Sequence, residues 1–135
     1  MAFTISLFYA GLLGLILFGL SLRVVMLRRQ LKVGIGSGDQ PELEKAIRAH
    51  ANFCEHAPLA LLLLVLLEGA GVVPVILLHV LGAVLVISRV MHGFMGINRT
   101  AGVSTGRFVG TLLLWAMILL GSGMAVGIST RWMIG

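Results

Sequence analysis

The chain has 135 residues, of which 59% are hydrophobic and only 11% are charged. Its mean hydropathy of +1.07 is far above that of a soluble domain of ordinary composition. This composition excludes an ordinary soluble enzyme and predicts an integral membrane protein. The net charge of +5 does not indicate nucleic-acid binding, because the same cations serve membrane topology and attraction to anionic headgroups.

Four apolar stretches are long enough to cross a hydrocarbon core of about 30 Å as helices. They cover residues 4–27, 43–67, 74–95 and 108–128. Because backbone in lipid must satisfy its own hydrogen bonds, each stretch is expected to be helical. No basic residue precedes the first stretch and no clear cleavage site follows it, so we do not interpret it as a signal peptide. We predict an all-α fold, a four-helix membrane bundle that forms one domain over residues 1–135.

Cations gather beside two of the three predicted connections. Those in or beside the first connection are Arg23, Arg28, Arg29, Lys32 and Lys45. Arg99 and Arg107 lie around the third connection, whereas the turn at 69–73 has none. The positive-inside bias therefore predicts that the first and third connections are cytoplasmic and that both termini lie outside.

The second stretch carries an arginine, an amide and a carboxylate, which are Arg48, Asn52 and Glu55. At 100° per residue, their spacings of four and three keep the three side chains in one narrow stripe of a helix. An ionisable group at membrane depth costs at least about 2.5–3.5 kcal/mol, so these groups need one another or a ligand. The stripe is predicted to face protein rather than lipid.

Pro58 removes a backbone hydrogen bond from the same stretch, just past the stripe. Two interpretations stay open: a tolerated membrane-helix proline, or a bend that widens a pocket.

The third stretch carries Arg89 and His92, three residues apart on one face. Arg89 is predicted either to form a structural bridge to Glu55 or to contact a ligand.

Pairs of small residues four positions apart favour close packing between membrane helices. They are Gly106 with Gly110, Gly123 with Gly127, and Ala10 with Gly14. A protomer of only four helices has little interior of its own. Oligomerisation is therefore the expected way to shield the polar stripe from lipid.

Other candidate sites are weaker. His50 and His56 have no companions at metal-ligand spacing, so no metal is predicted, and Cys54 is interpreted as a packing residue. The glycine-rich segment 34–39 follows a helix and lacks the Lys-Ser/Thr pair of a phosphate-binding loop. Nucleotide binding is therefore not predicted.

The polar residues of the second stretch follow the order Glu44-x-x-x-Arg48-Ala-x-x-Asn52-x-x-Glu55-x-x-Pro58. This order closely resembles the second-helix signature of the MAPEG family, the membrane-associated proteins of eicosanoid and glutathione metabolism. Arg89 with His92, and Arg107 at the start of the fourth stretch, extend the resemblance over essentially the whole chain. The short connections are similar to those of the bacterial branch, so a bacterial inner membrane is the expected location.

The resemblance implies a homotrimer of four-helix protomers that holds glutathione between neighbouring subunits at the cytoplasmic side. Carried over by position, Arg48, Asn52 and Glu55 would bind the tripeptide, and Arg107 would be the catalytic residue that stabilises its thiolate. Further contacts with glutathione are implied at His56, Arg89 and His92, with Arg28 and His50 reaching in from the neighbouring subunit.

Two residues depart from the family pattern: His56 and Gly96 occupy places where many members have tyrosines. The reaction of the animal relatives therefore does not carry over. The leading hypothesis is a glutathione transferase or peroxidase acting on lipophilic electrophiles from the bilayer. The alternative is a non-catalytic lipid-binding or scaffolding protein that keeps the stripe as an interhelical polar network. A small proton-coupled exporter is disfavoured, because the first stretch has no acidic residue.

Overall fold

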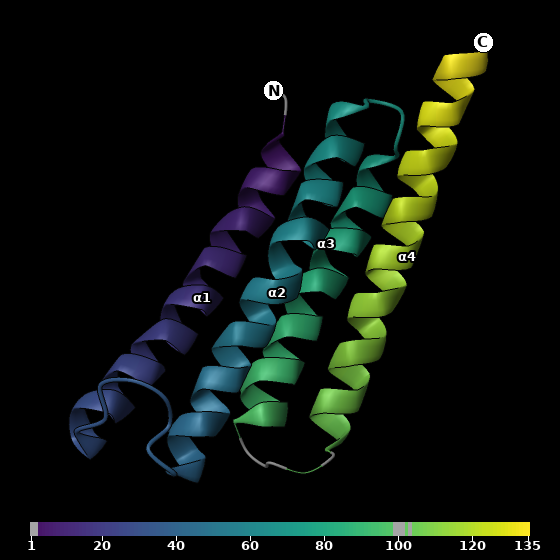
Figure 1. Ribbon diagram of the computed structural model, residues 1–135. Helices are drawn as coiled ribbons and strands as arrows, with labels where there is room; N and C mark the ends of the chain where they lie inside the picture. Colours follow the sequence, from purple (N-terminus) through teal and green to yellow (C-terminus); the bar gives the residue numbers. More distant parts are fainter. Residues whose placement is uncertain (1–2, 99–101, 103) are drawn as a thin grey trace.

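The computed structural model is a bundle of long helices that run side by side (Figure 1). It describes residues 3–98, 102 and 104–135, so Arg99 lies outside the described residues. The elements are α1 (Thr4–Leu31), α2 (Pro41–Gly69), α3 (Val75–Val90), the π-helix η1 (Met91–Ile97) and α4 (Thr105–Ile134). With α3 and η1 taken together, these make four helical stretches that are long and apolar enough to cross a membrane. The prediction of an all-α, four-helix membrane bundle is confirmed.

The helices run further than their apolar stretches. Arg28 and Arg29 form the last turn of α1, where cations favour the negative end of the helix dipole. Pro41 opens α2, a position at which its missing N–H costs nothing. At the start of α4, the Ser104 hydroxyl accepts the backbone N–H of Arg107 at 3.3 Å and caps the helix. Polar residues thus lengthen these helices beyond the predicted bounds.

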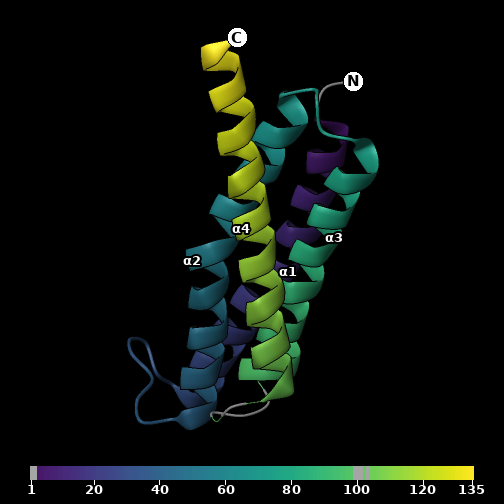
Figure 2. The same cartoon turned by 90° about the vertical axis from the view of Figure 1, so that its right-hand side faces the viewer.

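Successive helices run in opposite directions (Figures 1 and 2). The connection 32–40, the end of η1 and the start of α4 lie at one end of the bundle. The turn between α2 and α3 lies at the other end, together with the start of α1 and the end of α4. This arrangement agrees with the predicted alternation of connections, while the side that faces the cytoplasm stays a prediction.

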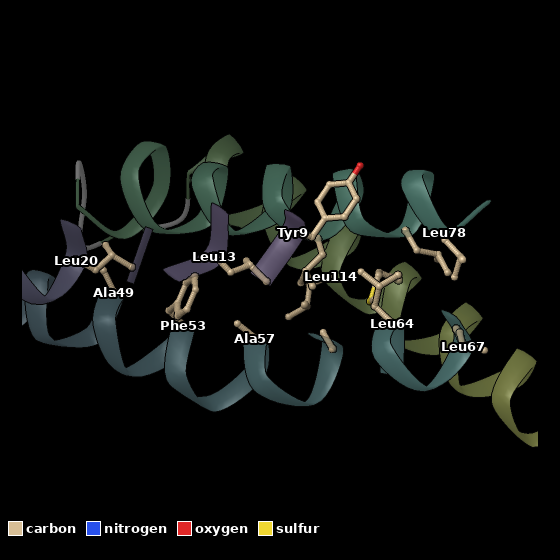
Figure 3. Packing of buried hydrophobic residues seen from close by; sticks show 14 of the residues in the cluster. Tyr9, Leu13, Leu20, Ala49, Phe53, Ala57, Leu64, Leu67, Leu78 and Leu114 are labelled. Atoms are coloured by element: carbon tan, nitrogen blue, oxygen red, sulfur yellow. The ribbon is translucent and has the colours of Figure 1, made fainter. Parts of the chain in front are cut away.

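The core lies along the line where the helices meet (Figure 3). Leu13 and Leu20 of α1 pack against the Ala49–Phe53–Ala57 face of α2, and Leu114 joins them from α4. Ala49 and Ala57 are almost fully buried, so α1 approaches the α2 backbone closely. Close packing of small residues, rather than water exclusion, is the expected source of cohesion between helices in lipid.

The start of α1 is anchored to α2 and α3 by polar groups. Glu68 of α2 accepts the backbone N–H of Ile5 at 2.9 Å and that of Ser6 at 2.7 Å. Tyr9 donates its hydroxyl to the carbonyl of His79 at 2.9 Å, and its ring lies against Gly82. A Cβ at position 82 would meet that ring at 2.2 Å, so only glycine allows this contact.

Glycines also bring α4 close to α3 and η1. A Cβ on Gly106 would lie 2.8 Å from the Met95 carbonyl, and one on Gly110 would lie 2.8 Å from the Ser88 carbonyl oxygen. The predicted close packing is confirmed for this pair of glycines. Gly123 and Gly127 have nothing within 4 Å of such a Cβ, so they do not serve packing within the described part of the chain.

Candidate functional site

A polar cavity of about 250 Å³ opens between α2, η1 and α4, at the end that carries the first and third connections. Its lining residues are Glu44, Lys45, Arg48, Asn52, His92, Ile97 and Arg107. Four of the predicted site residues therefore share one cavity: Arg48, Asn52, His92 and Arg107. They come from α2, η1 and α4, so the packing of these three elements brings them together.

Helical spacing explains how α2 contributes. Lys45 and Asn52 are seven residues apart, which is close to two full turns, and Arg48 lies between them. Arg48 is exposed and Lys45 and Asn52 are half-buried at the rim. Lys45 enters the sequence-based predictions only as a topology signal, but its spacing of seven from Asn52 is the pattern that indicates a shared face of α2.

The charges around the cavity favour an anionic ligand. Three cationic side chains line it, those of Lys45, Arg48 and Arg107, against the single carboxylate of Glu44. Neither Lys45 nor Arg48 forms an ion pair with any described residue. Cations without a protein counterion inside a low-dielectric wall raise the local concentration of anions.

Two hydrogen bonds to residues just before α4 hold Arg107 in place. It lies in the first turn of α4, which Ser104 caps, and its Nη1 donates to the carbonyl of Gly102 at 2.9 Å. Gly96 of η1 packs against it, because a Cβ there would lie 2.5 Å from the Cγ of Arg107. Gly96 therefore leaves room for the Arg107 side chain.

An apolar groove of about 260 Å³ adjoins the polar cavity. Its lining residues are His92, Arg107, Phe108, Thr111, Leu112 and Trp115. Arg107, Thr111 and Trp115 follow a spacing of four along α4, which is the sequence signal for a shared helix face. The groove and the polar cavity have His92 and Arg107 in common, so these two residues mark the junction.

Of the two interpretations of Arg89, the bridge to Glu55 is wrong, and the contact with a ligand stays a prediction. Arg89 is 2% exposed, and its Nη1 donates to the Asn52 side-chain oxygen at 3.0 Å. Glu55 is exposed and lies outside the polar cavity. Asn52 and Glu55 are separated by about 60° around the α2 axis, and α3 packs on the Asn52 side.

The remaining predicted residues lie outside the polar cavity. His56 contacts the backbone oxygen of Asn52 through Nδ1 at 3.0 Å, one helical turn back. His50 lies with its Nε2 3.9 Å from the Sγ of the exposed Cys54. Among the described residues, no group of three or more His, Cys, Asp and Glu side chains could hold a metal ion.

Arg28 forms hydrogen bonds with the backbone of the first connection. Its Nη1 donates to the backbone carbonyls of Val33, Gly34 and Gly36, at 3.4, 3.2 and 2.9 Å. Arg28 therefore fixes the path of the glycine-rich segment within this protomer. A role in a neighbouring subunit's cavity stays a prediction.

The fold and the cavity define a class: a four-helix integral membrane protein with a cation-lined cavity at one end. A family model described as the MAPEG family matches residues 6–127, and the chain belongs to this family. It is also 40% identical, over 88 residues, to the inner membrane protein YecN of Escherichia coli strains K12 and CFT073. The matched region covers 65% of this chain and spans only 66% of the length of each relative.

Proposed function

We propose that this protein binds glutathione in the polar cavity and acts as a glutathione transferase or peroxidase on lipophilic electrophiles. One observation carries the proposal: the polar cavity and the apolar groove meet at His92 and Arg107. A polar thiol and an apolar partner held on either side of that junction would have their reacting atoms adjacent. Such positioning is a major source of rate enhancement.

The lining residues match the groups that glutathione carries. Lys45 and Arg48 offer charge-assisted hydrogen bonds to carboxylates, and Glu44 offers an acceptor to the amine. A cation beside the sulfur favours the thiolate, which is the reactive nucleophile, and Arg107 is the residue at the junction. In transfer, the thiolate sulfur would bond to an electrophilic carbon while the leaving group departs with its electron pair.

We further propose an inner-membrane location and a homotrimer. The location is supported by four membrane-length helices and by a relative that is named as an inner membrane protein. The homotrimer is supported by the exposed charged face of α2, which includes Arg48 and Glu55. In this proposal the first and third connections lie in the cytoplasm, as the distribution of cations favours.

A non-catalytic lipid-binding or scaffolding role is the second candidate. It is favoured by Gly96, because no hydroxyl is present where a family tyrosine would approach the ligand. In that case the cation-lined cavity would hold an anionic lipid headgroup without any reaction.

Calorimetric titration of glutathione into the detergent-purified protein tests binding, and ultraviolet absorbance in the thiolate band tests activation. We expect glutathione to bind at neutral pH and to show thiolate absorbance. Arg107→Ala should abolish this absorbance while weakening binding only severalfold, because Lys45 and Arg48 keep their contacts. Arg131→Ala, at the far end of the same helix, is the matched control and should leave both signals unchanged.

The outcomes separate the two candidates. Binding without thiolate absorbance at any pH below the ionisation of the free thiol would contradict catalysis and favour the binding protein. Failure to bind glutathione would contradict both the transferase and the peroxidase. Binding of a fluorescently labelled anionic phospholipid, displaced by the same lipid without the label, would then favour the lipid-binding role.

A further inference from the structure

Arg89 is the most deeply buried ionisable side chain among the described residues, and it does not line the polar cavity. Its Nε donates to the Ser88 hydroxyl at 3.2 Å, and its Nη1 donates to Asn52 Oδ1 at 3.0 Å. Its Nη2 is buried with no partner in the described part of the chain. A buried guanidinium therefore stands directly behind one wall residue of the cavity.

The chemistry of the two groups fixes the orientation of the amide. A guanidinium has only donors, so the side-chain oxygen of Asn52 must face Arg89 and the amide nitrogen must face away. Within the described residues, nothing else bonds to the Asn52 side chain, which lines the polar cavity. The two N–H groups of this amide are thus left for a ligand.

We propose that Arg89 is a positioning residue that makes Asn52 a hydrogen-bond donor toward the polar cavity. A freely rotating amide could offer a ligand either an oxygen or an N–H group. With its oxygen held by Arg89, Asn52 selects ligands that present a carboxylate or carbonyl oxygen at this point. The proposal rests on the proposed function only where glutathione serves as the probe.

The charge of Arg89 also supports its role in orienting the Asn52 amide. A buried cation is costly unless it is compensated, and no carboxylate among the described residues pairs with Arg89. The guanidinium also polarises the amide to which it donates, which makes the opposite N–H groups better donors. A Glu55 bridge would have neutralised the guanidinium and left the Asn52 amide free to turn.

The first test needs no ligand. The chain has two asparagines, Asn52 and Asn98, so selective isotope labelling of asparagine gives two pairs of side-chain amide signals by nuclear magnetic resonance, one pair for each residue. We expect Asn52 to give one sharp, dispersed pair that collapses toward the averaged position in Arg89→Met. Arg23→Met, which removes an arginine that pairs with Glu42 away from Asn52, should leave it unchanged. An unchanged Asn52 signal in Arg89→Met would overturn the proposal, and an unchanged Asn98 signal would show that the variant is folded.

The second test measures affinity for glutathione in a double-variant cycle. Arg89→Met should weaken binding about tenfold, the equivalent of one charge-assisted hydrogen bond. In the Asn52→Ala background it should have no further effect. Additive losses would mean that Arg89 does not act through Asn52, and would overturn the proposal.

The Asn52→Asp variant tests ligand binding by Asn52 separately from the contribution of Asn52 to the stability of the fold. The carboxylate keeps an acceptor for Arg89, so the variant should be at least as stable as the unaltered protein, yet it has no donor for the ligand. We expect its affinity for glutathione to fall by about tenfold or more. Unchanged affinity would show that Asn52 serves only as a partner for Arg89. If the unaltered protein does not bind glutathione, the proposed function fails and the resonance experiment alone decides the positioning role.

Discussion

Gly96 has no side chain, and this absence leaves the space that the Arg107 side chain occupies. A Cβ at this position would lie 2.5 Å from Cγ of Arg107 and 2.9 Å from its backbone nitrogen. The side chain could move aside, but the backbone of a capped helix cannot do so without shifting the start of α4. We therefore expect Gly96→Ala to lower the free energy of unfolding by about 1–3 kcal/mol through overpacking. It should also displace Arg107 and reduce the thiolate absorbance of bound glutathione.

Gly127→Ala is the matched control, because a Cβ there would meet no atom within 4 Å. An exposed helical glycine gains up to about 1 kcal/mol when it is replaced by alanine, so this variant should be slightly more stable. Equilibrium unfolding in mixed detergent micelles would compare the two variants. Equal stability of Gly96→Ala and Gly127→Ala would show that η1 and α4 are less tightly packed than the structure indicates.

Helix α1 depends on a carboxylate that belongs to another helix. Glu68 satisfies two of the backbone N–H groups at the start of α1, where a negative charge also favours the helix dipole. We expect Glu68→Ala to cost about 1–2 kcal/mol of unfolding free energy, and Glu68→Gln less, because its amide keeps one acceptor. Glutathione affinity should not change, since Glu68 lies at the end of the bundle opposite the polar cavity.

The same unfolding experiment includes a surface carboxylate as reference. Glu42 is exposed, and its one ion pair among the described residues is with Arg23 at 3.5 Å, an interaction that contributes little at a surface. If Glu68→Ala were no more destabilising than Glu42→Ala, the capping role of Glu68 would have no energetic basis.

The helices were predictable from apolar length, because lipid imposes that length on any spanning segment. Their ends were not, since polar residues such as Arg29 continue a helix without an apolar signal. Nothing in the composition of Met91–Ile97 distinguishes a π-helix from an α-helix, although π-turns are frequent at functional sites. The overall architecture therefore follows from hydropathy, whereas local helix geometry depends on packing against α4.

The candidate site also has features that follow from the sequence and features that depend on how the helices pack. Spacing predicted that Arg48 and Asn52 would share a face, and both line the polar cavity. Spacing could not predict that Arg89 contacts Asn52 rather than Glu55, because that choice depends on where α3 packs around α2. Residues on one helix can be grouped from sequence, but the partner that each one meets comes from the tertiary arrangement.

The exposed face of α2 bears on how the chain assembles. Arg48 and Glu55 lie on this face, and so do the exposed Leu62 and Leu66 further along the helix. Glu55 has no hydrogen-bond or ion-pair partner among the described residues. A charged residue that faces lipid costs at least a few kcal/mol, so this face needs a protein surface against it. A second copy of the chain would supply one, with the polar cavity near the junction.

We therefore expect a homotrimer in mild detergent, and native mass spectrometry measures the stoichiometry directly. Leu62→Arg should dissociate it, because a charge placed in the apolar half of a subunit junction would be buried without a partner. Leu119→Arg is the control, since this residue is 75% exposed and belongs to α4 rather than to α2. A monomer or dimer that persists across several detergents and added lipids would contradict the trimer. Dissociation by Leu119→Arg but not by Leu62→Arg would place the junction on another face of the bundle.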